Sequence, residues 1–236
     1  MTKRTTLISG ATRGIGRAVA DMEAADGHHV ITLARNPAPD DFPGDCYIVD
    51  LFDRKDTAAV MEKIVADHKI DKVVHCAGLA NPQMIWDVTL EQFDQVIEIN
   101  LRASIQMVQA ALPHMREQNW GRIINISSRA ALGRITRTSY GAAKSGMYGM
   151  TRSWALELAT QGITANVVAP GPTLTEMLKF NNPDLEAFAA EIPMQRLGEP
   201  KEIAAMIHFL ISENASFCTG QVIYVDGGLS VGMVHL

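Results

Sequence analysis

Near the start of the chain stands the stretch Thr5-Thr6-Leu7-Ile8-Ser9-Gly10-Ala11-Thr12-Arg13-Gly14-Ile15-Gly16, from which the fold class can be argued. Residues 5–9 are strand-like, glycines follow, and residues 17–26 show helical periodicity. Glycine lets the backbone turn tightly and approach a ligand, and the N–H groups at a helix start suit a pyrophosphate. The loop therefore predicts a nucleotide site, although its Gly-x-x-x-Gly-x-Gly spacing departs from the commoner Gly-x-Gly-x-x-Gly.

The second strand-like run, residues 29–33, ends in Ala34-Arg35-Asn36. This point lies roughly 20 residues beyond the glycines, where a chain that binds NAD is expected to carry Asp or Glu for the ribose hydroxyl. The position is basic here. Arg35 and Arg13 can instead hold a 2′-phosphate through charge-assisted hydrogen bonds. Solvated surface arginines are the alternative, but the placement favours NADP (NADPH), with NAD still possible.

Strand-like and helical patterns alternate along the rest of the chain. Further strands are expected at residues 46–49, 72–74, from Ile123, 164–169 and 220–225, and helices from Asp53 to about Asp67, from Thr89 toward Pro113, from Tyr140 to Gly162 and from Pro200 to about Ser212. The alternation predicts the α/β class: a single doubly wound (Rossmann) domain over residues 1–236, with a seven-stranded parallel sheet flanked by helices. Ligands are expected at the carboxyl ends of the strands.

Two places break the regular pattern. Asn100 lies inside the helical stretch after Thr89, where a polar amide indicates a kink or a buried network. Residues 174–197 show no periodicity and carry scattered apolar side chains, which fits a substrate lid as well as packed surface.

The composition argues against several functional classes. The 236 residues are 47% hydrophobic and 20% charged, as in a soluble globular protein, and the net charge of -5 argues against a nucleic-acid partner. No apolar run is long enough for a signal-peptide core or a membrane span, so we expect a cytoplasmic protein without a membrane partner. The 3 cysteines form no Cys-x-x-Cys pair and the 7 histidines lack ligand spacing, so no metal site is expected.

The stretch from Ile123 to Lys144 carries the candidate chemistry. A buried strand is expected to end near Ser128, and Tyr140 and Lys144 stand four residues apart in the following helix, hence on one face. A nearby ammonium favours the phenolate and would bring the pKa of Tyr140 toward neutrality. Ser128 adds a hydroxyl for a substrate oxygen. Taken alone, the pattern is as consistent with a turn and a chance pairing.

Together, these residues resemble the short-chain dehydrogenase/reductase family, and within it the 3-oxoacyl-[acyl-carrier-protein] reductase-like members. The likeness covers nearly the whole chain. It rests on Ser9-Gly10-x-x-x-Gly14-Ile15-Gly16, Ala77-Gly78, Asn100, Ser128, Tyr140-x-x-x-Lys144, Pro170-Gly171 and the ending from Gly220-Gln221-Val222 to Asp226-Gly227-Gly228.

The resemblance implies roles for four catalytic residues. Tyr140 would transfer the proton, Ser128 (or its neighbour Ser127) would hold the carbonyl oxygen, and Asn100 would hold a water in the proton relay. Lys144 would bind the nicotinamide ribose and lower the pKa of Tyr140. The cofactor-binding residues that it implies are Gly10, Thr12, Arg13, Gly14, Ile15, Gly16, Arg35, Asp50, Leu51, Ala77, Gly78, Tyr140, Lys144, Pro170, Gly171, Thr173 and Thr175.

One motif departs from the family pattern. Where the family usually has Asn-Asn-Ala-Gly, this chain has His75-Cys76-Ala77-Gly78, which removes amides that brace the sheet and the cofactor. We expect His75 to replace them in part.

The activity implied by the resemblance is NADPH-dependent reduction of a carbonyl. The alternatives are an NAD(P)-dependent dehydrogenase that oxidises a secondary alcohol and, from another class, a non-catalytic dinucleotide-binding regulator. The expected partner is a small carbonyl or alcohol with hydrophobic parts, either free or bound to an acyl carrier protein. Arg129, Arg134 and Arg137 would steer that carrier's acidic surface, unless they are a solvated basic loop. The family also suggests a homotetramer.

Overall fold

Apolar, β-branched segments form the strands of one sheet at the centre of the molecule. The structure, a computed structural model, describes residues 2–181 and 184–232. Every neighbouring pair of strands is parallel, and the order is β3-β2-β1-β4-β5-β6-β7. The predicted seven-stranded parallel sheet is therefore confirmed. Its strands are β1 (Thr5–Ser9), β2 (His29–Ala34), β3 (Asp45–Ile48), β4 (Lys72–His75), β5 (Gly121–Ile126), β6 (Ile163–Pro170) and β7 (Val222–Val225).

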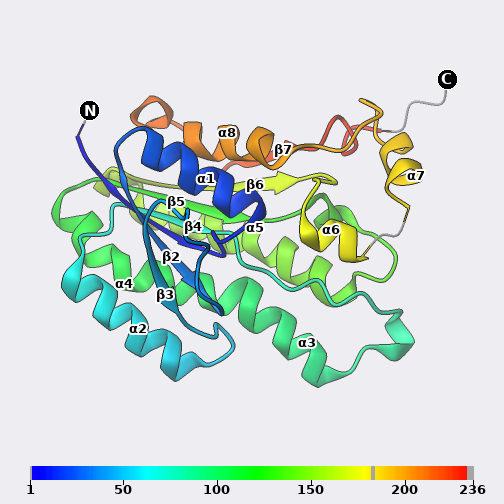
Figure 1. Ribbon diagram of the computed structural model, residues 1–236, viewed down its shortest axis with the longest axis horizontal. Helices are drawn as coiled ribbons and strands as arrows, with labels where there is room; N and C mark the ends of the chain where they lie inside the picture. Colours follow the sequence, from blue (N-terminus) through cyan, green and yellow to red (C-terminus); the bar gives the residue numbers. More distant parts are fainter. Residues whose placement is uncertain (1, 182–183, 233–236) are drawn as a thin grey trace.

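Helices cover both faces of the sheet (Figure 1). They are α1 (Gly14–Ala25), α2 (Arg54–Asp67), α3 (Leu90–Ile97), α4 (Ala103–Glu117), α5 (Thr138–Leu158), α6 (Glu176–Asn181), α7 (Leu185–Ala190) and α8 (Pro200–Leu210). Short 3₁₀ turns lie at η1 (Ile85–Asp87), η3 (Arg129–Leu132), η4 (Ala159–Gln161) and η5 (Glu213–Ala215), and η2 (Glu98–Arg102) is a π-helix. Within the described residues, the search for a helix of membrane-spanning length and apolarity finds none.

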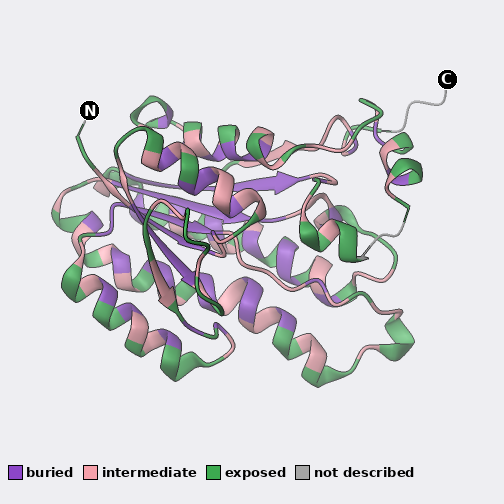
Figure 2. Cartoon of the chain, in the orientation of Figure 1, coloured by how far each residue is buried: buried purple, intermediate pink, exposed green. Residues whose placement is uncertain are grey.

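Two apolar cores result from this layering. Side chains of α1 and α8 pack on one face of the sheet, and those of α2, α4 and α5 pack on the other. The inner strands β1, β2, β4, β5 and β6 are buried along most of their length, as Figure 2 shows in purple, whereas the edge strands β3 and β7 are partly exposed. Strands buried on both faces read as continuous apolar runs, which is why β5 and β6 could be found from the sequence.

Several boundaries differ from those expected. The first helix begins at Gly14, three residues before the periodic pattern does, because glycines carry no side chain that marks a helix face. The helix expected to run toward Pro113 continues to Glu117, since Met115 still packs in the core. The irregular stretch 174–197 contains the short helices α6 and α7, and its residues 182 and 183 lie outside the described residues.

The irregularity expected at Asn100 is confirmed. The π-helix η2 interrupts the helical stretch at this point, and Asn100 is fully buried within it. A π-bulge inside a helix often accompanies a functional site.

The strand order reverses between β1 and β4. The chain moves outward from β1 to β2 and β3, then returns to place β4 on the other side of β1. The connections that follow β1 and β4 therefore diverge, and a crevice opens at the carboxyl ends of these strands. This is where the sequence analysis expected the ligand.

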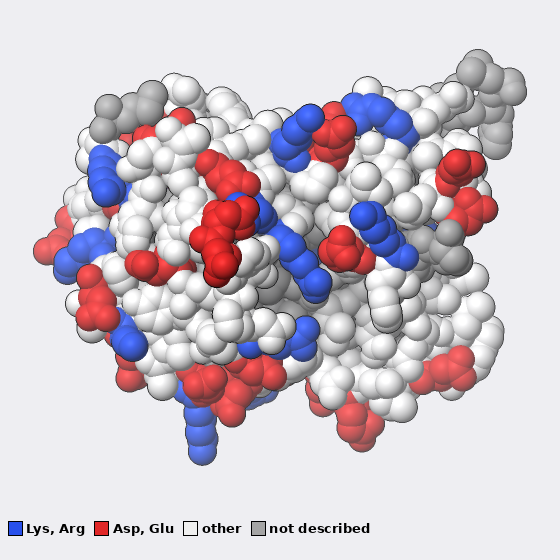
Figure 3. Space-filling model, in the orientation of Figure 1, with Lys and Arg blue, Asp and Glu red and all other residues white. Residues whose placement is uncertain are grey.

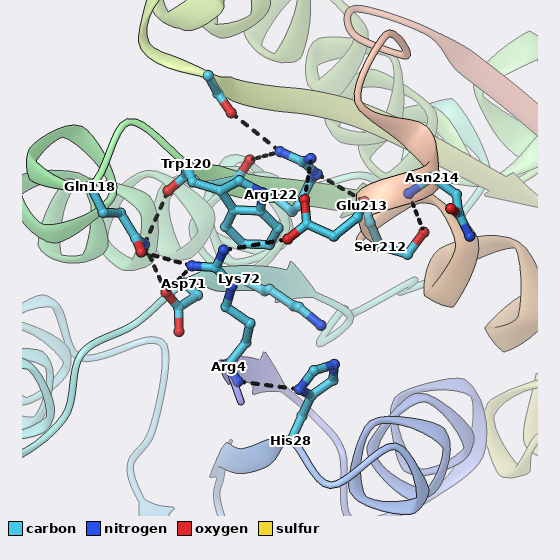
Figure 4. A network of polar contacts seen from close by, with 12 residues as sticks. Arg4, His28, Asp71, Lys72, Gln118, Trp120, Arg122, Ser212, Glu213 and Asn214 are labelled. Carbon is cyan, nitrogen blue, oxygen red and sulfur yellow. Dashed lines mark hydrogen bonds and ion pairs between the residues drawn. The ribbon is translucent and has the colours of Figure 1, made fainter. Parts of the chain in front are cut away.

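A polar network closes the opposite end of the sheet (Figure 4). The Trp120 ring lies between two guanidinium groups, with its centroid 3.9 Å from Cζ of Arg4 and 4.3 Å from Cζ of Arg122. Arg122 is buried and donates to the carbonyl oxygens of Ser212 and Gly162. Since each of its guanidinium nitrogens faces a carbonyl or a carboxylate, this end serves stability.

A buried ion pair ties α1 to β4. Glu23 is fully buried, and its carboxylate accepts from Nζ of Lys72 at 2.7 Å, from Nδ1 of His208 at 3.0 Å and from the Thr6 hydroxyl. Removing one member of such a pair leaves an uncompensated buried charge.

We therefore expect Lys72→Met to lower the free energy of unfolding by about 3–5 kcal/mol. Adding Glu23→Gln should recover part of the loss, because the neutral amide no longer needs the ammonium. Urea denaturation of both variants and the wild type measures the difference. If Lys72→Met alone were as stable as the wild type, the Glu23 charge would need no compensation from Lys72.

Candidate active site

The loop between β1 and α1 is shaped by close backbone packing. A Cβ on Gly10, whose φ is +73°, would lie 3.1 Å from Cα of Ala77, and one on Gly16 would lie 2.5 Å from the carbonyl oxygen of Gly10. Neither position accepts a larger residue without a backbone shift. No side chain caps the N-terminus of α1, where Arg13 is the N-cap residue. Its first N–H groups thus remain available to an anion.

A cavity of about 830 Å³ opens beside this loop, at the carboxyl ends of the central strands. The face seen in Figure 3 is hollowed near its middle, and basic as well as acidic side chains lie around the hollow. The cavity brings together most of the residues expected at the site. They are Gly10, Thr12, Arg13, Gly14, Ile15, Arg35, Asp50, Leu51, Ala77, Gly78, Ser128, Tyr140, Lys144, Pro170, Gly171, Thr173 and Thr175.

Two expected site residues lie behind the cavity wall. Gly16 is buried against the backbone of Gly10, so its part is to let the loop fold. Asn100 donates through Nδ2 to the carbonyl oxygens of Leu79 (2.9 Å) and Val96 (2.8 Å). Its Oδ1 is buried without a hydrogen-bond partner among the described residues and lies 2.8 Å from where a Cβ on Gly78 would stand. Only a glycine at position 78 leaves that acceptor open.

The two arginines expected to hold a phosphate are exposed at the cavity rim. Arg13 follows β1 and Arg35 follows β2, and both line the cavity. In the part of the chain that the structure describes, no ion pair engages either side chain. The nearby Arg17, by contrast, is neutralised by Asp21 and Asp41. The placement of Arg13 and Arg35 suits a dianion at that end.

The candidate catalytic side chains meet at the end of β5 and the start of α5. Lys144 is buried, donates from Nζ to the carbonyl oxygen of Ile126 at 2.7 Å, and lies 5.4 Å from the ring centroid of Tyr140. The Ser128 hydroxyl lies close enough to the Tyr140 phenol to act on its pKa by hydrogen bonding. The hydroxyl of Ser127 donates instead to the carbonyl oxygen of Lys144 at 2.8 Å. Of the two serines, Ser128 is thus the one that faces the phenol.

Burial is the largest influence on the pKa values of Tyr140 and Lys144. It raises the pKa of Tyr140, against the opposing effects of the Ser128 hydrogen bond and the Arg137 charge. Burial also lowers the pKa of Lys144 to about 8. The expectation that Lys144 brings the pKa of Tyr140 down is therefore not met in this structure, because the ammonium is directed at a backbone carbonyl and desolvation outweighs it.

His75 joins β1, β4 and the π-helix. Its Nε2 lies 3.0 Å from the carbonyl oxygen of Ile99, an acceptor only, so Nε2 carries the proton. Its Nδ1 then accepts from the Ser9 hydroxyl at 2.9 Å. Ser9 Oγ in turn accepts the N–H groups of Cys76 and Ala77, each at 3.1 Å. A neutral imidazole thus braces the sheet here, in line with the partial replacement expected of His75, whereas the sequence showed Ser9 only as the first residue of the glycine motif and not as its partner.

A cluster of possible metal ligands, which the sequence spacing did not indicate, lies at the opposite end of the sheet. Ligand atoms of His29, Asp45 and His68 lie within 4.8 Å of one another. His29 is paired with Asp45 at 2.9 Å, and His68 is hydrogen-bonded to Tyr47 at 3.0 Å. Because these side chains already bind one another, we interpret the cluster as a polar edge of β2 and β3 rather than a metal site.

Comparison with known proteins gives the family. The model described as enoyl-(acyl carrier protein) reductase matches residues 10–230. The chain is 37% identical over 240 residues to the 3-oxoacyl-[acyl-carrier-protein] reductase FabG of Thermotoga maritima, covering 95% of this chain and 97% of the relative. This chain belongs to the short-chain dehydrogenase/reductase family. It is an oxidoreductase resembling the 3-oxoacyl-[acyl-carrier-protein] reductases.

Solved structures agree. A short-chain dehydrogenase/reductase family protein superposes with a TM-score of 0.90 at 33% identity, over 96% of this chain and 97% of the other. ElxO with NADP bound superposes with a TM-score of 0.89 at 29% identity, over 97% and 99%. A nicotinamide dinucleotide is accordingly the cofactor class of this chain. The glycine cradle of Gly10 and Gly14 and the uncapped start of α1 fit its pyrophosphate.

The buried imidazole makes a prediction about acid stability. Burial, reinforced by the charge of Lys144, lowers the pKa of His75 to about 3. Between about pH 6.5 and 3, His75 binds a proton in the unfolded chain but stays neutral in the folded chain. The free energy of unfolding therefore decreases as the pH falls through this range. Between pH 7.5 and 5.0 the wild type should lose about 2 kcal/mol more than His75→Asn, as measured by urea unfolding. Equal losses in both proteins would contradict a neutral, buried His75.

Proposed function

We propose that this protein is an NADPH-dependent carbonyl reductase that transfers hydride to a ketone of the 3-oxoacyl type, with Tyr140 as the proton donor. The observation that carries the proposal is the meeting of Ser128, Tyr140 and Lys144 on the wall of the cavity that begins at the glycine loop. The residues on which the cofactor would lie and those that would handle the proton share one cavity.

The loop of β1 and the start of α1 would hold the pyrophosphate, while Arg13 and Arg35 would hold the 2′-phosphate. Lys144 would hold the nicotinamide ribose, Asp50 the adenine and Thr175 the carboxamide, as the family resemblance implies. When bound, NADPH supplies the hydride. The chain itself supplies orientation, a hydrogen bond to the carbonyl oxygen from Ser128, and the proton.

The raised pKa of Tyr140 supports its role as the proton donor in reduction. A phenol that stays protonated at neutral pH can donate its proton to the oxygen on which negative charge develops. The Ser128 hydroxyl, which lies close to this phenol, would hold the same oxygen. The cavity thus offers an acid for reduction, and the same phenol would take up the proton if an alcohol were oxidised in the reverse direction.

The open acceptor of Asn100 supports a proton relay. Its Oδ1 has no partner among the described residues. A Cβ placed on Gly78 would lie 2.8 Å from this oxygen and 3.5 Å from Nζ of Lys144, so both groups face the space that the missing side chain leaves. A water at this place would bridge the two groups and lead protons toward Tyr140. Buried polar atoms of this kind ordinarily have a partner.

The substrate lid and the assembly are further parts of the proposal. Met177 and Phe188 of the 174–197 segment line the cavity, which supports a lid over hydrophobic parts of the substrate. Leu90 on α3 and Leu156 on α5 expose 77% and 83% of their surface, which supports the homotetramer that the resemblance suggests. The relatives named for acyl-carrier-protein substrates support a thioester ketone as the first candidate to test.

Tyr140→Phe keeps the ring but removes the transferable proton. We expect turnover of a ketone substrate to fall by about 10²–10⁴-fold, with NADPH binding retained. An NADPH-oxidation screen over 3-oxoacyl thioesters, quinones and simple ketones provides the substrate, and fluorescence titration provides the NADPH affinity. Tyr47→Phe, a matched change in β3 outside the cavity, should retain activity. A Tyr140→Phe enzyme with most of its turnover would refute the role of Tyr140 as acid.

Arg35→Asp tests cofactor choice. The substitution replaces attraction for the 2′-phosphate with repulsion and offers an acceptor to a ribose hydroxyl. We expect kcat/KM for NADPH to fall roughly 10- to 100-fold while that for NADH holds or rises. Arg116→Asp on α4, distant from the cavity, is the matched control. Wild-type enzyme with equal kcat/KM for the two cofactors would contradict the assignment.

A further inference from the structure

Two arginines on the cavity wall have charged donors without an acceptor. Arg129 opens η3 directly after Ser128, Arg137 precedes α5, and both line the same cavity as Tyr140. Nε of Arg129 and Nη1 of Arg137 are buried and lack a hydrogen-bond partner among the described residues. Because a buried unpaired donor is costly, such nitrogens indicate an acceptor supplied from outside the chain.

Arg129, Arg134 and Arg137 place three positive charges close together on this wall, where they repel one another. Arg134 lies close enough to Arg129 and Arg137 for like charges to act between them, and its guanidinium covers the Phe188 ring at 4.3 Å. The Glu191 carboxylate also acts on Arg134, so the charge of this third arginine is offset within the chain. Arg137 also acts on the Tyr140 phenol. Within the described residues no ion pair joins a carboxylate to Arg129 or Arg137. An anion bound between them would relieve the repulsion.

The backbone that positions Arg137 is strained. Thr136 has a φ of +65°, a left-handed conformation that β-branched residues rarely adopt. Its carbonyl oxygen accepts from the backbone N–H of Gln83 at 2.9 Å, and Gln83 forms a parallel bridge with Arg137. The Gln83 side chain is itself anchored to Gln92 at 2.6 Å. Strain of this kind persists where the surroundings impose it, commonly at ligand sites.

From these contacts we propose that Arg129 and Arg137 form a subsite for a carboxylate carried by the substrate itself, beside the carbonyl that Tyr140 protonates. The inference rests on the proposed reductase function and adds to its candidate substrates the ketones that carry a free carboxylate, the oxo acids. A carboxylate is planar and matches the fork of a guanidinium, and the buried nitrogen of each half-buried arginine gives it a desolvated donor. Steering of a distant acidic carrier would instead call for exposed charges with solvated nitrogens.

Matched pairs of substrates test the subsite. Acetoacetate, 4-oxopentanoate and 5-oxohexanoate are each compared with their neutral ethyl esters, with NADPH, in the wild type and in Arg137→Gln and Arg129→Gln. For at least one chain length the wild type should prefer the acid by tenfold or more in kcat/KM. Each variant should reduce that acid-to-ester ratio by about 10- to 100-fold, because one charged hydrogen-bond donor is lost.

Two controls separate charge from folding. Arg152→Gln removes an exposed arginine of α5 that does not line the cavity, and it should leave the acid-to-ester ratio and the activity unchanged. Arg137→Lys keeps the charge but not the planar fork, and it should retain part of the preference. Thermal unfolding of each variant shows whether the protein remains folded. The acid-to-ester ratio of kcat/KM does not depend on the fraction of active protein, because both substrates are measured with the same sample.

The outcomes distinguish the subsite from the reductase function. Reduction of the esters with no acid preference at any chain length, or a preference that survives in both Gln variants, would overturn the subsite alone. If only 3-oxobutanoyl acyl carrier protein, and no free acid, lost rate in the Gln variants, the arginines would serve a carrier and the subsite would again fail. Absence of NADPH oxidation with every carbonyl would overturn the reductase function as well.

Discussion

The cavity depends on one buried junction between β1 and β4. Ser9 Oγ accepts two successive backbone N–H groups, those of Cys76 and Ala77, while its own proton goes to His75. This allows the chain to leave β4 and pass within van der Waals contact of Gly10. The glycine loop and the wall at Gly78 are held face to face as a result, and the imidazole extends the junction to the π-helix that holds Asn100.

The two ends of the sheet differ in where their polar groups lie relative to the cavity. At the amino ends, Arg4 and Arg122 stack on Trp120 and donate to carboxylate and carbonyl oxygens, although Nε of Arg4 has no hydrogen-bond partner among the described residues. At the carboxyl ends, Asn100 and Arg137 keep buried polar atoms without partners among the described residues. The arginines at the amino ends are engaged mainly within the chain, whereas the unpaired atoms at the carboxyl ends lie on or behind the cavity wall, where a ligand can satisfy them.

Desolvation sets the chemistry of the site more than pairwise attraction does. It raises the pKa of Tyr140 and lowers the pKa of Lys144 to about 8, so the phenol keeps its proton while the amine is close to losing one. The spacing of Tyr140 and Lys144 correctly predicted that they share a helix face. It did not predict the direction of the Tyr140 shift, because a spacing carries no information about how much water surrounds a group.

The sequence by itself determined the alternation of strands and helices, the parallel sheet, the glycine loop and the interruption at Asn100, because each leaves a local pattern of apolar, glycine or misplaced polar residues. Only the tertiary structure decided that Ser128 rather than Ser127 faces Tyr140, that His75 bridges Ser9 and Ile99, and that a strained Thr136 directs Arg137. These outcomes depend on contacts between residues far apart in the chain, and burial, which governs charge, exists only once those residues have met.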